Sequence, residues 1–349
     1  MSLPEPQSLR RNEREDMSSF KVRLIAEHIV KQVARHRSEA LAASNRGSSN
    51  AGSHAIKPLL VGMQGPQGSG KTTLTSQLLD ELRTARYDVR AAVFSLDDLY
   101  LTHADQKALA AVHPSNKLLE GRGQPGTHDV PLGSAVLQSI AGMNELSEGG
   151  ITARVLDLPV YDKSAHGGEG DRSGETVKVH APLDVVIWEG WCMGFGSLEP
   201  AVLRDKYDRS SSYARTGTTS ASGASYFTRH PIVHLQEVNS QLALYEATWW
   251  AQIDAFVQLA PTPPSGQRDE GSEALDTVFV WRLQAERAMK ERNGGKGMSD
   301  EAVREFVARY MPGYELFGDG VQGVKKPWHG RGLRLGLDSD RNVTEVRTF

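Results

Sequence analysis

Short apolar runs alternate along the chain with segments whose apolar residues recur at helical spacing. A strand covered on both faces is apolar throughout, whereas a helix that packs by one face repeats its apolar residues every three or four positions. Strands are predicted at 58–63, 89–94, 153–158, 185–188 and 278–281, with an edge strand at 333–337. Helices are predicted at 20–41, 71–86 and 235–259. This alternation predicts an α/β fold with a mostly parallel central sheet and helices on both of its faces.

The predicted helix 235–259 carries aromatic residues on its apolar stripe. Tyr245, Trp249 and Phe256 align with Leu235 and Leu242 at helical spacing. Such a stripe either packs into the core or offers a stacking surface for nucleobases. The aliphatic residues that share the stripe favour the core.

Composition divides the chain into an N-terminal extension, 1–55, and one larger domain, 56–349. We expect residues 1–17 to be disordered and the amphipathic helix to follow them. The stretch 43–55 is rich in Ser, Gly and Asn, which predicts a flexible linker between the helix and the larger domain.

Two polar stretches are predicted to be insertions in the larger domain, near 209–226 and 261–274. Both are rich in Gly, Ser, Thr or Pro, and neither has enough apolar residues to bury a core. We therefore expect both to be surface loops.

Charge and cysteine content exclude several classes of protein. The 40 basic and 43 acidic residues give a net charge of -3, which argues against a general nucleic-acid or anionic-membrane binder. No apolar run approaches the roughly 20 residues that span a bilayer, and the N-terminus lacks a secretory signal. The single cysteine, Cys192, excludes an internal disulfide and is expected to be a small buried hydrophobe rather than a catalytic thiol. A cytoplasmic location is predicted, with an organelle left open.

A phosphate-binding motif follows the first predicted strand. The segment 65–72, GPQGSGKT, fits G-x-x-x-x-G-K-[ST] and lies between an apolar strand and a helix, as in the P-loop NTPase fold. Glycines let the backbone curl so that its N–H groups point at phosphate oxygens. Lys71 can reach the β- and γ-phosphates, and the Thr72 hydroxyl can bind Mg²⁺. The residues predicted to hold the nucleotide are Gly65, Pro66, Gln67, Gly68, Ser69, Gly70, Lys71, Thr72 and Thr73.

Acidic residues follow two other predicted strands. Asp97 and Asp98 come after the strand 89–94, at the edge where open α/β sheets bind ligands. Asp97 is predicted to be the base that accepts the proton of an attacking hydroxyl, although adjacent aspartates also cap turns. Glu189 ends the strand 185–188 and is predicted to organise Mg²⁺, the alternative being a buried acid paired with a basic residue. We leave the role of Asp98 open.

Longer segments resemble one kinase family. The chain resembles the D-glycerate 3-kinase family, with its fungal ATP-dependent kinase members, within the phosphoribulokinase and uridine kinase group. The most specific segments are GRGQPGTHD at 121–129 and YDKSAHGGEGDR at 161–172, and the others are SLDDLYLTHADQ at 95–106, VIWEGWCMGF at 186–195, VFVWRLQAERAMKE at 278–291 and GMSDEAVREFVARYMPGYELF at 297–317.

The resemblance implies roles for individual residues. Asp97 corresponds to the catalytic base, with Lys71 acting on the transferring phosphate. The residues that the resemblance assigns to the acceptor pocket are Tyr100, Arg122, His128, Asp129, Lys163 and Arg172, and those it assigns to a lid are Arg282 and Arg287. A carboxylate on the acceptor needs cations, and Arg122 can supply a bidentate contact that His128 or Lys163 supplements.

The implied activity is transfer of a phosphate from MgATP to a small hydroxyl acceptor, with D-glycerate converted to 3-phosphoglycerate. The sequence leaves two alternatives open. One is a kinase of the same fold that acts on a nucleoside, pantothenate or a sugar phosphate. The other is a nucleotide-dependent switch or scaffold, which would not need the acceptor residues.

Overall fold

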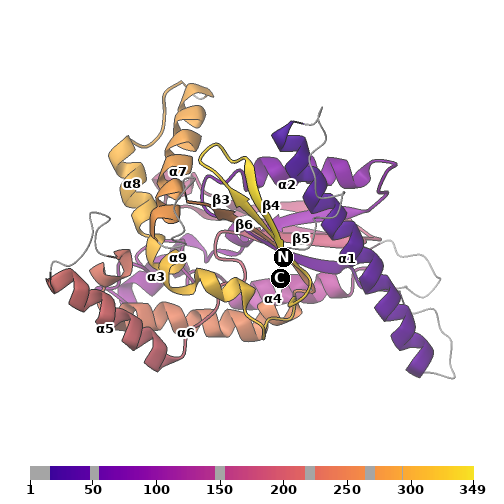
Figure 1. The fold of residues 1–349 in the computed structure, drawn as a ribbon, viewed down its shortest axis with the longest axis horizontal. Helices are drawn as coiled ribbons and strands as arrows, with labels where there is room; N and C mark the ends of the chain where they lie inside the picture. Colours follow the sequence, from indigo (N-terminus) through magenta and orange to yellow (C-terminus); the bar gives the residue numbers. More distant parts are fainter. Residues whose placement is uncertain (1–15, 48–54, 146–153, 217–224, 264–271, 293) are drawn as a thin grey trace, which may run out of the picture.

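The computed structural model describes residues 16–47, 55–145, 154–216, 225–263, 272–292 and 294–349 (Figure 1). The strands are β1 (Leu59–Gln64), β2 (Ala91–Ser95), β3 (Val155–Asp162), β4 (Asp171–His180), β5 (Val185–Gly190), β6 (Ala255–Pro261), β7 (Gly332–Leu337) and β8 (Val343–Thr348). The α-helices are α1 (Met17–Gly47), α2 (Lys71–Arg83), α3 (His103–Val112), α4 (Val130–Ala141), α5 (Pro200–Thr216), α6 (Ile232–Thr248), α7 (Ser272–Arg292), α8 (Asp300–Ala308) and α9 (Met311–Phe317). None of these helices is both long and apolar enough to cross a bilayer.

The central sheet has six strands in the order β2-β5-β1-β6-β7-β8. Every neighbouring pair is parallel except β7 and β8. The strands β3 and β4 form a separate antiparallel pair. The predicted α/β fold with a mostly parallel sheet is therefore confirmed.

The two faces of the sheet bury different sets of side chains. Leu59, Val61 and Met63 of β1 pack with residues of α1 and α2, whereas Leu60 belongs to the core on the opposite face. That opposite core also contains buried residues of α4 and α6. In Figure 1, α1 and α2 lie on one side of the sheet and α4 and α6 on the other. The alternation follows from the twofold repeat of a strand.

Two predicted elements are wrong, and each error has its own cause. The prediction of one helix over 235–259 joined the end of α6 to the start of β6. Because β6 is buried on both faces, its apolar run continues the helical pattern, and only a short 3₁₀ turn, Trp250–Gln252, separates the two elements. The core assignment of the aromatic stripe is nevertheless confirmed, since Tyr245, Trp249 and Phe256 are fully buried.

The predicted strand 278–281 lies inside α7. Val278 and Trp281 are buried, whereas Val280 between them is 42% exposed. The repeat of three is that of a helix, and the β-branched and aromatic composition of VFVW misled the prediction.

Other predicted elements are present, but their strand partners or their bounds differ from the prediction. The strand predicted near 153–158 is β3, which pairs only with β4, and the predicted edge strand 333–337 is β7, whose outer side pairs with β8. The first part of the insertion 209–226 continues α5 to Thr216, and the helix α1 runs through 43–47, where a linker was predicted. The remaining parts of these predictions at 1–15, 48–54, 217–224 and 264–271 lie outside the described residues.

Candidate active site

The segment 65–72 forms a tight loop between β1 and α2. Gly68 and Gly70 have φ values of 75° and 88°, which residues with side chains rarely adopt. A Cβ atom on Gly68 would lie 2.5 Å from the carbonyl carbon of Trp281 in α7. Gly68 is therefore needed both for the turn and for the close approach of α7.

Cations hold the carbonyl groups of this loop. Lys71 donates its Nζ to the carbonyl oxygens of Gly65 and Pro66, at 2.7 and 3.2 Å. Arg341, in the turn between β7 and β8, donates Nε to the carbonyl oxygen of Gly68 at 2.7 Å. These carbonyls are thus occupied by cations. Because the N–H groups of Gly65, Gln67 and Ser69 already donate within the protein, the anion site is expected at the later N–H groups of the loop, 70–72, where α2 begins.

The loop shares its sheet edge with the two predicted acids. In the register of the sheet, Met63 of β1 is beside Glu189 of β5, and Glu189 is beside Ser95 of β2. Asp97 follows Ser95 in a 3₁₀ turn, and its backbone N–H donates to the Ser95 hydroxyl at 3.2 Å. Because these strands are parallel, the phosphate loop, Glu189 and Asp97 all lie at the carboxyl edge.

Lys163, in the loop between β3 and β4, forms an ion pair with Asp97. Its Nζ lies 2.6 Å from Asp97 Oδ2, and the Asp97 side chain is 26% exposed. Burial alone would raise the pKa of Asp97, but Lys163 and, less strongly, Lys71 lower it below its usual value. Burial lowers the pKa of Lys71, against the opposing charges of Glu189 and Asp97. Lys71 of the loop and Asp97, the predicted base, therefore lie close enough for their charges to interact.

The donors available for a cation near the phosphates are Glu189 and Thr72. Within the described residues, the Glu189 carboxylate has no hydrogen-bonding or ionic partner, and Thr72 is exposed at the start of α2. The described residues contain no group of three or more His, Cys, Asp or Glu side chains placed to hold a metal ion. One carboxylate and one hydroxyl fit Mg²⁺, which takes its remaining ligands from phosphates and water.

Four of the predicted acceptor residues form one connected network. Asp129 caps α4 by accepting from the backbone N–H of Leu132 at 2.9 Å, and its other oxygen lies 2.8 Å from Arg172 Nη2. Arg172 also donates to the carbonyl oxygen of Tyr100 at 3.3 Å. The Tyr100 ring stacks on His128 with a centroid distance of 4.4 Å. The network joins β4, α4 and the turn that carries Asp97.

His128 is neutral, which differs from the expected cationic supplement. It is 4% exposed, and burial lowers its pKa to about 3. The Nδ1 atom lies 2.9 Å from the Tyr245 hydroxyl, whereas the buried Nε2 has no partner among the described residues. His128 can therefore take part as a hydrogen-bonding group but not as a positive charge.

Arg122 holds a loop rather than standing free. Its Nη1 donates to the carbonyl oxygens of Gly168 and Glu169, and its Nη2 donates to that of Lys163 at 3.2 Å. The guanidinium also lies 5.7 Å from the Tyr161 ring centre. In this arrangement, Arg122 positions the segment that presents Lys163 to Asp97.

Asp98 has a structural contact. Its Oδ1 accepts from the backbone N–H of Tyr161 at 3.1 Å, which joins the Asp97 turn to β3. Burial raises the pKa of Asp98, in contrast to its neighbour. The two adjacent acids therefore have different environments and different partners.

The two arginines predicted for a lid do not point into the set around Asp97. Arg282 pairs with the buried Glu286 at 2.7 Å and lies over the Phe306 ring. Arg287 forms an ion pair with Asp300 of α8. In Figure 1, α7 and α8 project side by side at one end of the molecule.

Three residues of the site escaped the sequence analysis. Tyr314 accepts from the backbone N–H of Gln67 at 3.2 Å, and the Tyr310 hydroxyl lies beside Gly123. Burial raises the pKa of Tyr310, and the charge of Asp97 adds to this rise. Both tyrosines belong to the quoted segment 297–317, where their spacing of four was a usable signal. Arg341, in a polar turn, offered none.

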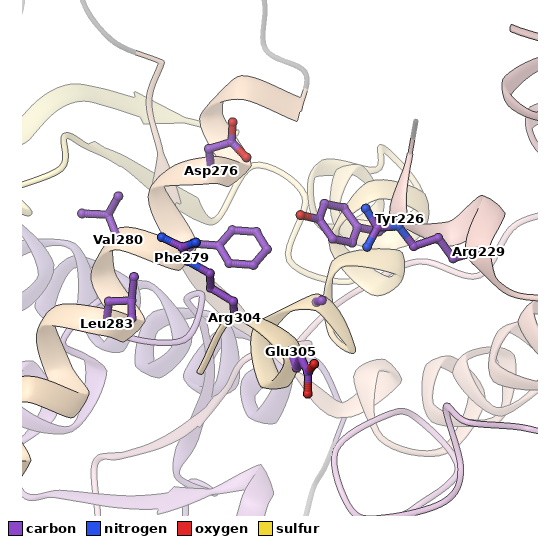
Figure 2. Close-up of a pocket in the computed structure, with 9 residues that line it drawn as sticks. Tyr226, Arg229, Asp276, Phe279, Val280, Leu283, Arg304 and Glu305 are labelled. Atoms are coloured by element: carbon purple, nitrogen blue, oxygen red, sulfur yellow. The ribbon is translucent and has the colours of Figure 1, made fainter. Parts of the chain in front are cut away.

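A cavity of about 460 Å³ lies beside α7 and α8 (Figure 2). Tyr226 and Phe279 face each other across it with ring centres 5.7 Å apart, and Arg229 lies over the Tyr226 ring. Its other lining residues are Asp276, Val280, Leu283, Arg304, Glu305 and Ala308. None of them belongs to the phosphate loop or to the set around Asp97, so the cavity is not part of the candidate active site.

Known proteins are similar to this chain in sequence and structure over most of its length. The chain is 40% identical to D-glycerate 3-kinase from Cryptococcus neoformans var. grubii, and the two structures match with a TM-score of 0.79 over 94% of this chain and 99% of that one. It is 34% identical to the probable ATP-dependent kinase TDA10 of Saccharomyces cerevisiae, over 83% of this chain and 88% of TDA10.

A plant relative is similarly close in sequence but longer. The chain is 34% identical to the chloroplastic D-glycerate 3-kinase of Arabidopsis thaliana over 82% of its own residues, and it spans about half of that protein, 54%. No family model matches the chain. On its match to TDA10 and to the Cryptococcus structure, this chain belongs to the D-glycerate 3-kinase family of P-loop kinases.

Proposed function

We propose that the protein transfers the γ-phosphate of ATP to D-glycerate and forms 3-phosphoglycerate. The observation that carries the proposal is geometric: the phosphate loop with Lys71 and the Asp97 carboxylate lie at the same carboxyl edge of the sheet, after the strands β1 and β2 that both flank β5. A phosphate site and a base at one edge let an alcohol attack phosphorus in line. The two relatives named D-glycerate 3-kinase support glycerate as the acceptor.

In the proposed reaction, the acceptor oxygen forms a bond to the γ-phosphorus as the bond to the β–γ bridging oxygen breaks, and ADP leaves. The hydroxyl proton passes to Asp97 Oδ. The lowered pKa of Asp97 makes it a weak base. That weakness suits a loose transition state, in which the proton leaves late and the carboxylate mainly orients the hydroxyl. Lys71 stabilises the charge on the transferring group.

Mg²⁺ is proposed to bind Thr72 and Glu189. When bound, it would neutralise charge on the β- and γ-phosphates. The support for this assignment is the position of Glu189 beside β1 at the edge that carries the loop, where its carboxylate has no hydrogen bond or ion pair among the described residues.

Lys163 is the proposed contact for the acceptor carboxylate. Among the described residues, its side chain is held only by the ion pair with Asp97, and it is 57% exposed. The guanidinium groups of Arg122 and Arg172 are each bound to more than one protein group. Tyr100, His128 and Asp129 then shape the pocket. The Nε2 atom of neutral His128, which is buried and has no partner among the described residues, is the proposed contact for a substrate hydroxyl. Arg282 and Arg287 stay proposed lid residues, and each would have to leave its acid to reach the phosphates.

The test is a kinase assay with resolved products. Purified protein and MgATP are incubated with D-glycerate, L-glycerate, uridine or pantothenate, ADP release is measured, and phosphorus NMR separates 2- from 3-phosphoglycerate. Asp97→Asn serves as the blank. The proposal predicts 3-phosphoglycerate from D-glycerate alone. Phosphorylated uridine without phosphoglycerate would remove the acceptor assignment, and ATP turnover without any phosphorylated acceptor would favour a nucleotide switch.

A further inference from the structure

Two cationic side chains connect the N-terminal helix to the phosphate loop. Lys21 of α1, 9% exposed, donates its Nζ to the backbone carbonyl oxygen of Arg341 at 2.9 Å. Arg341 donates Nε to the carbonyl oxygen of Gly68 at 2.7 Å and Nη2 to that of Trp281 at 3.1 Å. An unbroken chain of contacts thus joins α1, the β7–β8 turn, the phosphate loop and α7.

The contact from Arg341 falls where the loop needs it. In a concave anion site, the N–H groups point inward and the carbonyl oxygens are directed away from the anion, so the carbonyls need donors of their own. The guanidinium supplies a charge-assisted donor to Gly68, a type of hydrogen bond stronger than a neutral one. By donating to both Gly68 and Trp281, Arg341 fixes a close backbone approach between the loop and α7, in which a Cβ atom on Gly68 would not fit.

The turn that carries Arg341 is held in a rare conformation. Arg341 has a φ of 66°, which is uncommon for a residue with a side chain. Its backbone N–H donates to the carbonyl oxygen of Asp338 at 2.9 Å, and the Trp281 indole donates to the carbonyl oxygen of Ser339 at 3.0 Å. Gln284 accepts from Arg341 Nη1 at 2.6 Å. Backbone strain of this kind persists where the surroundings specify it, and it is often found at functional sites.

We propose that Arg341 is a positioning residue for nucleotide binding, and that Lys21 extends this role to α1, so that the N-terminal helix is a working part of the nucleotide site. Burial, followed by the nearby charge of Arg341, lowers the pKa of Lys21. The side chain nevertheless donates to the Arg341 carbonyl oxygen. The Arg341 guanidinium beside the loop also favours an anionic ligand. The inference rests on the proposed use of ATP but not on the identity of the acceptor.

The experiment measures nucleotide affinity without any acceptor. The full chain is titrated with a fluorescent ATP analogue and Mg²⁺, and Tm is recorded for each variant. Arg341→Asn removes the guanidinium yet suits a left-handed φ, so it tests the contact without adding backbone strain. Arg341→Lys restores a cation, and Lys21→Met tests the second link. The matched control is Arg331→Ala, which removes another contact of α1, the ion pair between Arg331 and Glu39 at 3.0 Å, without touching the loop.

We expect Arg341→Asn to raise Kd about tenfold, as for loss of a charge-assisted hydrogen bond, with partial recovery in Arg341→Lys. Lys21→Met should raise Kd about threefold, and Arg331→Ala should leave it unchanged even if Tm falls. Wild-type affinity in both Arg341→Asn and Lys21→Met would overturn the inference. So would an equal loss in Arg331→Ala, which would reduce the effect to docking of α1. A wild-type chain that binds the analogue but does not phosphorylate glycerate would remove only the acceptor proposal.

Discussion

The two halves of the candidate active site are built from different groups. The nucleotide side, residues 65–72, is a backbone loop whose carbonyls are held by Lys71 and Arg341. The acceptor side consists of side chains in two partly exposed ion pairs, Lys163 with Asp97 and Arg172 with Asp129. Exposed ion pairs contribute little to stability and exchange readily for a ligand's charges. We therefore expect backbone geometry to serve the nucleotide and replaceable side chains to decide which acceptor is used.

The largest effect is expected on the nucleotide side. Lys71→Ala removes the donor to two loop carbonyls and the positive charge that stabilises the transferring phosphate. We therefore expect kcat/KM to fall about 10³-fold and the KM for ATP to rise. Steady-state kinetics with varied ATP checks this. The control is Lys57→Ala at the other end of β1, where Lys57 pairs with Asp254, and it should retain full activity. Unchanged kinetics in Lys71→Ala would contradict the phosphate site.

A smaller loss of activity is expected from a change at Asp97, which lies between the phosphate loop and the predicted acceptor residues. Asp97→Asn should lower kcat about 10²-fold with little change in the KM for ATP, because a neutral amide cannot accept the proton. The neighbouring Asp98→Asn keeps an oxygen for the Tyr161 N–H and should lose less than about fivefold. If both variants lose activity equally, Asp97 has no special role.

On the acceptor side alone, the effect should fall on the acceptor KM. Asp129→Ala frees Arg172 and removes the cap of α4, so the acceptor KM should rise about tenfold and the free energy of unfolding should fall by about 1 kcal/mol. Ser299→Ala is the control, because Ser299 caps α8 by accepting from the backbone N–H of Ala302 at 3.2 Å. Denaturant unfolding should show similar losses in both variants, and only Asp129→Ala should change the acceptor KM.

The smallest effect is a shift of a pH profile. The pKa of Asp97 lies below its usual value because Lys163 and Lys71 outweigh burial, so the wild-type rate should stay constant down to about pH 5. In Lys163→Met, burial acts with less opposition, the pKa rises, and the acid limb of kcat should move to higher pH. Lys107→Met removes a lysine that pairs with Glu169 of the same loop and should not move the limb. An unshifted pH profile in Lys163→Met would show that Lys163 does not set the pKa of the catalytic base.

Local rules recovered the parts of the site that depend on neighbours in sequence. The phosphate loop could be predicted because strand, glycines and helix follow one another within a few residues. The positions of Asp97 and Glu189 could be predicted because parallel strands end at one edge. The strand β6 could not be separated from α6, because burial on both faces removes the alternation that identifies a strand.

Contacts between distant segments lay beyond these rules. Arg122 has the residue type expected of a carboxylate ligand, yet its donors are used by carbonyls more than forty residues away. The neutral state of His128 depends on burial against Tyr100 and Tyr245, which no local pattern reports. The role proposed for Arg341 arises from a turn 273 residues from Gly68.

The thiol of Cys192 can report local opening of the structure near Asp97, without any engineered label. Cys192 is the only cysteine of the chain, it is fully buried, and burial followed by the charge of Asp97 raises the pKa of its thiol well above the usual value. A thiol reagent can therefore modify the native chain only when the floor of the site transiently exposes this side chain. The rate of modification, followed by mass spectrometry on the unmutated protein, measures that opening, and bound nucleotide should slow it.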